Sequence, residues 1–187
     1  NGLPGQRPFT DYVTDGSGTN KNQDRRGAFL KVVTELLAKD LKSLVDTWAP
    51  GGAYRTAFLK LPQDEVLKNI IGGLFFMTGE ELSTERMAVA VEQSQEDEHS
   101  CFSDYTHRDI YANAKGVNNI VFGAYEQIRG ISLYDLVKEV NPAQAEKLKN
   151  ASETSMAKIN GILNAITETK KFDGLIEEET LTSGGVI

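Results

Sequence analysis

Apolar side chains recur every three or four residues along most of this chain, and this spacing constrains its fold more than any other feature. Such spacing places the apolar side chains on one face of an α-helix, which then packs against other elements. Strand-like alternation of apolar and polar residues is nearly absent. The longest helical stripe consists of Phe29, Val32, Val33, Leu36, Leu37, Leu41, Leu44, Val45 and Trp48.

Residues with special backbone roles predict where further helices begin and end. Pro62 suits the first turn of a second helix, because its missing N–H costs nothing at that position. Thr78 and Glu81 fit a capping box, which predicts that a third helix begins directly after Thr78. A fourth helix is predicted over 104–129, with Gly130 as the left-handed residue that closes it.

The remaining residues predict one short helix and one more long helix. Ser132 suits the N-cap of the short helix, and Asn141 with Pro142 opens the long one. Long amphipathic helices joined by loops predict an all-α fold, an up-and-down four-helix bundle with short extra helices. The predicted organisation is an extended arm or linker over 1–22, a bundle over 23–180 and a tail over 181–187.

Charge and hydrophobicity narrow the classes of partner and activity. The net charge of −7 argues against nucleic acid, because an acidic surface repels phosphate groups. No run of 18 apolar residues is present, so the sequence predicts no membrane span. The single cysteine, Cys101, cannot form an internal disulfide, and its acidic neighbours argue against a reactive thiolate. Common catalytic motifs, such as a P-loop or His-Glu-x-x-His, are missing from the sequence.

Both histidines follow a carboxylate by three residues, which is the spacing of two side chains on one face of a helix. The pairs are Glu96 with His99 and Asp104 with His107. Each pair has the pattern that di-iron bundles use, but those bundles take two such motifs from different helices. From spacing alone the segment is either a metal site, with Glu96 and His99 as ligands, or an acidic turn at the surface.

Arg86 and three regularly spaced glycines also admit a structural and a functional interpretation. Arg86 lies near the apolar stripe of its helix, where it either pairs with Glu81 or Asp104 or holds an anionic ligand. Glycines recur every seven residues in the fourth predicted helix, which predicts either close approach of a neighbouring helix or room for a ligand. These glycines are Gly116, Gly123 and Gly130.

Five segments resemble the iron-regulated, imelysin-like proteins, and they follow one another in the order expected for that family. The strongest is the signature SQEDEHSCFSDYTHRDI, from Ser94 to Ile110. The others are RPFTDY at 7–12, NQDRRG at 22–27, EELSTERM at 80–87 and YEQIRG at 125–130.

The resemblance implies an all-helical protein with two similar four-helix bundles, of which this chain is similar to the C-terminal one. It implies that the protein is exported, either to the periplasm or to the outer membrane as a lipoprotein. In the second case, a lipid anchor outside this chain would be its only attachment to the membrane. It also implies a role in iron acquisition, with the ligand identity left open between iron and another divalent or trivalent metal ion. We expect the missing N-terminal half of the same protein, or a symmetry mate, to cover one face of the bundle.

On this half, the resemblance implies a site at the interface between the two bundles. The matching positions are Glu98, Ser100, Ser103, Asp104, Thr106 and Asp109, with Arg86 as a neighbour.

Three functions follow from these observations. The first is a non-enzymatic cell-envelope protein that binds a metal ion or an iron-related ligand. The second is a zinc metallopeptidase of the imelysin type, whose Gly-x-His-x-x-Glu motif this chain lacks, because Phe102 and Ile110 follow its two histidines by three residues. The third is a structural or adhesion module without a small ligand. We expect no enzymatic activity from this chain by itself.

Overall fold

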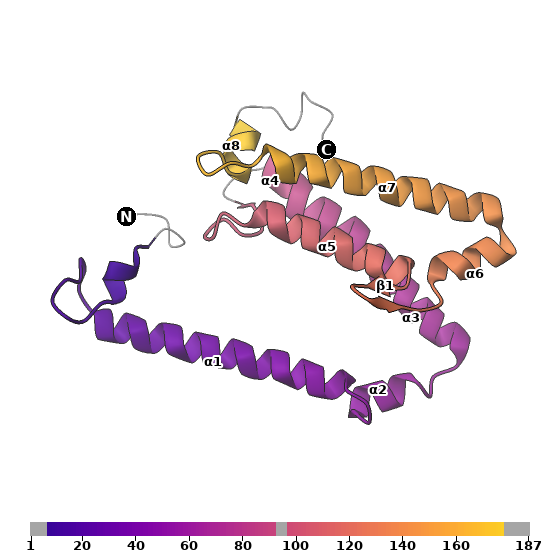
Figure 1. Cartoon of the computed structure of the whole chain (residues 1–187), viewed down its shortest axis with the longest axis horizontal. Coiled ribbons are helices and arrows are strands. Elements are labelled where there is room, and N and C mark those ends of the chain that lie inside the picture. Colours follow the sequence, from indigo (N-terminus) through magenta and orange to yellow (C-terminus); the bar gives the residue numbers. More distant parts are fainter. Residues whose placement is uncertain (1–6, 93–96, 178–187) are drawn as a thin grey trace. The chain divides into compact units, whose positions relative to one another are not determined.

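The computed structural model describes residues 7–92 and 97–177 (Figure 1). Contacts divide the chain into two compact units, Asn1–Ile71 and Gly72–Ile187, and the boundary falls within one helix. Each unit is described by itself below. The tail predicted over 181–187 lies outside the described residues.

The first unit begins with a folded segment that is organised around a buried carboxylate. After the short 3-10 helix η2 (Phe9–Tyr12), the chain returns so that Thr19 and Asn20 donate to Asp11 over 2.9 and 3.2 Å. Arg7 donates to the same carboxylate over 2.8 Å. Burial by itself would raise the pKa of Asp11, but these hydrogen bonds outweigh it and hold that pKa below its usual value.

Helix α1 (Gln23–Trp48) carries the longest apolar stripe, as the sequence predicts. The stripe is not covered within the first unit: the side chains of Phe29 and Val45 are 71% and 65% exposed. At its C-terminal end, the Trp48 ring packs against rings of the short helix α2 (Ala53–Phe58), with centroids 4.9 Å from Tyr54 and 5.5 Å from Phe58. Helix α3 (Gln63–Phe75) follows Pro62, as predicted.

The second unit is a helical bundle with one small hairpin, which confirms the all-α prediction. Its elements are the end of α3, the π-helix η3 (Phe76–Ala88), α4 (Val89–Glu92), α5 (Thr106–Val121), strands β1 (Ala124–Tyr125) and β2 (Ile128–Arg129), α6 (Leu133–Val140), α7 (Pro142–Ala165) and α8 (Phe172–Glu177). Helix α5 packs against both η3 and α7, and the strands pair antiparallel (Figure 1). The core includes Leu82, Ala90, Ile110, Ala114, Ile159, Ile162, Phe172 and Leu175. No helix within the described ranges is long and apolar enough to cross a bilayer.

The predicted capping box at Thr78 is wrong. The hydroxyl of Thr78 donates back to the carbonyl of Leu74 over 2.8 Å, so it satisfies an acceptor of the preceding turn and does not cap a new helix. The helical backbone therefore continues from α3 through η3 into α4, without the break that the sequence pattern suggested.

The fourth predicted helix ends eight residues early, because Gly123 and not Gly130 terminates it. Gly123 has a φ of +57°, and its carbonyl accepts from the N–H of Gly130 over 3.0 Å, which closes the β1–β2 hairpin. A Cβ on Gly123 would meet the Gly130 carbonyl oxygen at 2.7 Å, so this turn requires a glycine. The prediction of close approach at Gly116 is also wrong, since a Cβ added to that residue would meet nothing within 4 Å.

The caps of the last two predicted helices are confirmed, but two short α-helices of the described residues were missed. Ser132 and Asp135 form a complete capping box at α6, and Asn141 Oδ1 accepts from the N–H of Gln144 over 3.1 Å at α7. They are α2 and α8, and α8 buries Phe172 completely. Six residues carry too short a pattern for a helix to be predicted from spacing.

Candidate functional site

The signature segment forms a tight loop that leads into helix α5. Thr106, the first residue of α5, is fully buried, and its hydroxyl oxygen accepts from the N–H of Ser100 over 3.0 Å. The carbonyl of Ser100 in turn accepts from the N–H of Ser103 over 3.0 Å. Asp104 adopts a left-handed backbone with φ of +54°, which turns the chain into the helix. Two hydrogen bonds of the Ser100 backbone and the turn at Asp104 thus shape the loop around Ser100.

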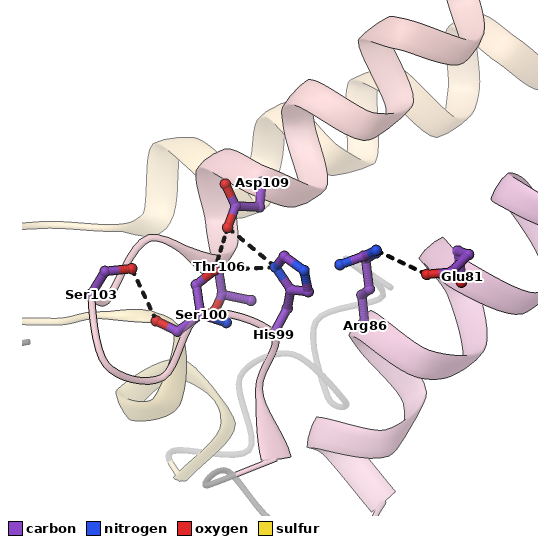
Figure 2. Close-up of polar contacts among 7 residues, drawn as sticks. All are labelled: Glu81, Arg86, His99, Ser100, Ser103, Thr106 and Asp109. Carbon is purple, nitrogen blue, oxygen red and sulfur yellow. Dashed lines mark hydrogen bonds and ion pairs between the residues drawn. The ribbon is translucent and has the colours of Figure 1, made fainter. Parts of the chain in front are cut away.

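Three polar side chains from this loop and the first turn of α5 converge at one point (Figure 2). His99 Nδ1 lies 3.2 Å from Asp109 Oδ2 and 3.1 Å from Ser100 Oγ. The Ser100 hydroxyl also donates to Asp109 Oδ2. We call these three residues the His99–Ser100–Asp109 cluster.

The cluster has the residue types of a hydrolytic triad but not its geometry. In a triad the histidine accepts from the serine with one ring nitrogen and donates to the carboxylate with the other. Here Nδ1 faces both partners, and the serine already donates to the carboxylate. One ring nitrogen cannot accept and donate at once, so this arrangement does not activate Ser100 as a nucleophile.

Arg86 lies beside His99 and forms an ion pair with Glu81 (Figure 2). Its Nη2 donates to Glu81 Oε2 over 2.8 Å, and the Arg86 side chain is 18% exposed. Its Nε is buried and has no hydrogen-bond partner among the described residues. The predicted structural pairing of Arg86 with Glu81 is thus confirmed.

An open pocket of about 560 Å³ separates the π-helix from His99. Three glutamates face one arginine there, so carboxylates are in excess and the pocket suits a cation better than an anion. Its lining residues are Phe76, Glu80, Glu81, Glu85, Arg86 and His99.

Comparison with known proteins agrees with the sequence resemblance. Residues 2–181 match the family described as imelysin, which is nearly the whole chain. The chain belongs to the imelysin family. No curated protein matches it.

Several residues that the sequence singled out in this imelysin-family chain lie together. Ser100, Thr106 and Asp109 are joined by hydrogen bonds in and around the cluster, and His99 completes it. Arg86 shares the pocket with His99 but makes its ion pair away from the cluster. Their role as a binding site stays a prediction.

Other predicted residues have different surroundings. Glu98 is buried, with 6% exposure, and the Ser103 hydroxyl donates to the Ser100 carbonyl over 3.3 Å. Glu96, the predicted metal ligand beside His99, lies outside the described residues.

The second predicted carboxylate–histidine pair does not form a ligand pair in the described structure. His107 is buried, and its Nδ1 has no hydrogen-bond partner among the described residues. Burial lowers the pKa of His107, and the nearby charges of Arg108 and Lys171 lower it further. The carboxylates of Asp104 and Asp109 oppose this shift without reversing it. His107 is therefore a neutral residue of the bundle interior near neutral pH.

The described residues bring few metal ligands together, and the fit of a metal ion at the His99–Ser100–Asp109 cluster depends on the Ser100 hydroxyl as a third ligand. Within residues 7–92 and 97–177, no group of three His, Cys, Asp or Glu side chains is placed to hold a metal ion. The His99–Ser100–Asp109 cluster supplies an imidazole, a carboxylate and a hydroxyl. Ser100 Oγ lies 3.1 Å and Asp109 Oδ2 lies 3.2 Å from His99 Nδ1. A cation bound there would have only part of its coordination from this chain's described residues.

Sequence reasoning missed the pocket wall formed by Phe76, Glu80 and Glu85. Glu85 lies five positions after Glu80 and nine after Phe76, and neither spacing keeps residues on one face of an α-helix. The spacing becomes meaningful only once the segment is known to be π-helical.

Proposed function

We propose that this imelysin-family chain is a non-enzymatic component of the bacterial cell envelope that takes part in iron uptake. In this proposal, it binds a metal ion or an iron-related ligand at the His99–Ser100–Asp109 cluster. Iron is the cargo, and a second protein surface or a chelator supplies the coordination that this chain does not. The location in the periplasm, or at the outer membrane as a lipoprotein, rests on the resemblance of the signature segment.

The convergence of three donor atoms is the observation that carries the proposal. Metal–ligand bonds to nitrogen and oxygen are about 2.0–2.2 Å long, which places neighbouring donor atoms roughly 3 Å apart. The distances of 3.2 and 3.1 Å from His99 Nδ1 to Asp109 Oδ2 and Ser100 Oγ match this spacing, and a bound cation would replace the hydrogen bond that the Ser100 hydroxyl donates to Asp109 Oδ2. A carboxylate, a hydroxyl and an imidazole suit ferric or ferrous iron and zinc better than soft ions.

The surroundings of the cluster support a ligand that is shared with another surface. The side chains of His99 and Asp109 are 36% and 37% exposed, so a ligand can reach them. The adjoining pocket has an excess of carboxylates, which favours the approach of a cation.

Calorimetric titration of the whole chain tests the binding step. We would titrate zinc, anaerobic ferrous iron and calcium into the wild type and into Asp109→Asn, which removes the charge but keeps the side-chain size. The proposal predicts saturable binding of zinc and iron, weakened at least tenfold by Asp109→Asn. Asp40→Asn, on exposed α1, is the matched control and should bind as the wild type does.

Two results would contradict the proposal. One is a wild-type chain that binds none of the three ions while its circular dichroism spectrum shows a folded protein. The other is equal affinity of the wild type and Asp109→Asn. The envelope role has a separate test, in which the protein is quantified in cell fractions of the source bacterium grown with and without iron. Enrichment in the cytosolic fraction would refute it.

A further inference from the structure

The segment that forms one wall of the pocket has an unusual helical register. Phe76–Ala88 is π-helical over 13 residues. Most π-helical segments in proteins are single turns, and they are frequent at functional sites. A stretch of this length between α3 and α4 therefore calls for a physical explanation.

Two side-chain hydrogen bonds in this segment join residues that are five positions apart. Arg86 donates to Glu81 over 2.8 Å, and the Thr84 hydroxyl donates to the Gly79 carbonyl over 3.0 Å. An α-helix has 3.6 residues per turn, so residues five apart point about 140° away from each other. The Arg86–Glu81 ion pair therefore depends on the π register.

The pocket depends on the same register. Phe76, Glu81 and Arg86 line it at intervals of five residues, as do Glu80 and Glu85. In an α-helical register Glu85 would point about 180° away from Phe76, and Arg86 about 80° away. Those two side chains would then leave the face that His99 approaches.

We propose that Glu81 is a positioning residue, which holds Arg86 and the π register and thereby builds the pocket wall beside His99. The ion pair spans one turn of η3, so it stabilises the π-helix against the α-helix, in which the two residues would point about 140° away from each other. This inference rests on the proposed binding at the His99–Ser100–Asp109 cluster, because the register matters for function only if a ligand occupies that cluster and its pocket.

The first test measures the register directly and needs no ligand. Nuclear Overhauser effects between residues i and i+5 distinguish a π-helix from an α-helix, which gives i to i+4 contacts instead. We expect i to i+5 contacts over 76–88 in the wild type and in Glu80→Gln, and their loss in Glu81→Gln. A wild type with only i to i+4 contacts, or a Glu81→Gln variant that keeps the i to i+5 contacts, would overturn the inference.

The second test measures zinc affinity of the whole chain by calorimetry. Residues that position metal ligands typically contribute about 10–100-fold to affinity, so we expect Glu81→Gln and Arg86→Gln each to weaken zinc binding about tenfold. The double variant Glu81→Arg with Arg86→Glu keeps an i to i+5 ion pair and should restore affinity to within about threefold of the wild type. Glu80→Gln makes the same change in charge in the same pocket without breaking the pair, so it should weaken zinc binding clearly less than Glu81→Gln does.

These outcomes separate the two proposals. Equal weakening by Glu80→Gln and Glu81→Gln would mean that only the pocket's charge matters, which overturns the positioning role. Failure of the charge-swapped variant, with its i to i+5 contacts intact, would also overturn it, because the arginine charge itself would then act on the ligand. A wild type that binds no zinc refutes the proposed function, and the register measurements then decide the inference by themselves.

Discussion

Replacement of Thr106 by valine tests whether one hydrogen bond sets the shape of the signature loop. Thr106 is fully buried at the start of α5, and its hydroxyl accepts from the N–H of Ser100 over 3.0 Å. Valine has nearly the same shape, so the substitution removes this acceptor without opening a cavity. A buried donor left without a partner costs about 1–3 kcal/mol. Because Ser100 is only half-buried, water reaches it in part, and we expect about 1–2 kcal/mol.

Urea unfolding followed by circular dichroism measures this loss. With a denaturant slope of roughly 2 kcal/mol/M, the midpoint of Thr106→Val should fall by about 0.5–1 M, with the slope unchanged. The variant should also bind zinc more weakly, because Ser100 is no longer held in the His99–Ser100–Asp109 cluster. Thr106→Ser is the control, since it keeps the hydroxyl and should keep zinc affinity even where the lost methyl group lowers stability. Wild-type stability and zinc affinity in Thr106→Val would refute the reasoning.

Three further predictions concern the bundle. Phe172→Ala should lower the free energy of unfolding by about 3–5 kcal/mol, because the ring is completely buried. The control Phe102→Ala removes an exposed ring and should change the free energy of unfolding by less than about 0.5 kcal/mol. Similar effects of the two variants in urea unfolding would mean that α8 does not pack on the bundle. Ser132→Ala removes the N-cap of α6 and should lower the free energy of unfolding by about 1 kcal/mol, whereas the control Ser132→Thr retains the cap. Equal stability of the two variants would contradict the capping role. The lowered pKa of His107 means that the unfolded chain binds its proton first as pH falls below 6.5, so stability should be full above that pH and decline below it. His107→Gln should reduce this decline by at most about 1.4 kcal/mol per pH unit, and an unchanged pH profile would show that His107 is not responsible.

Much of the helical fold could be predicted because its signals are local. The stripe from Phe29 to Trp48 lies on α1, and the caps at Ser132 and Asn141 open α6 and α7. Spacing and capping involve residues within one or two turns of each other, so they can be read without a tertiary structure. The predicted breaks failed where two local signals competed. At Thr78 a capping hydroxyl turned back to Leu74, and at Gly123 a glycine inside an apparent helix ended it.

The candidate site could be predicted only in part, for a related reason. Ser100, Thr106 and Asp109 belong to one segment of the chain, so the family resemblance named them together. The pocket wall comes from η3, and nothing in the spacing of Glu81 and Arg86 reveals that they share a face. Five residues apart is an unfavourable spacing for contact in an α-helix, so α-helical periodicity does not bring these two residues together.

The sequence by itself determined the all-α class, the main helices and the imelysin family, since these depend on local periodicity and on ordered motifs. The tertiary structure decided which polar groups of the signature act together. It turned the loop so that His99 and Ser100 meet Asp109, and it placed the Arg86–Glu81 pair in the pocket that His99 also lines. Convergence of side chains at distances near 3 Å depends on the full backbone path, including the left-handed turn at Asp104 and the π register of η3. Residue spacing along the chain does not encode that path.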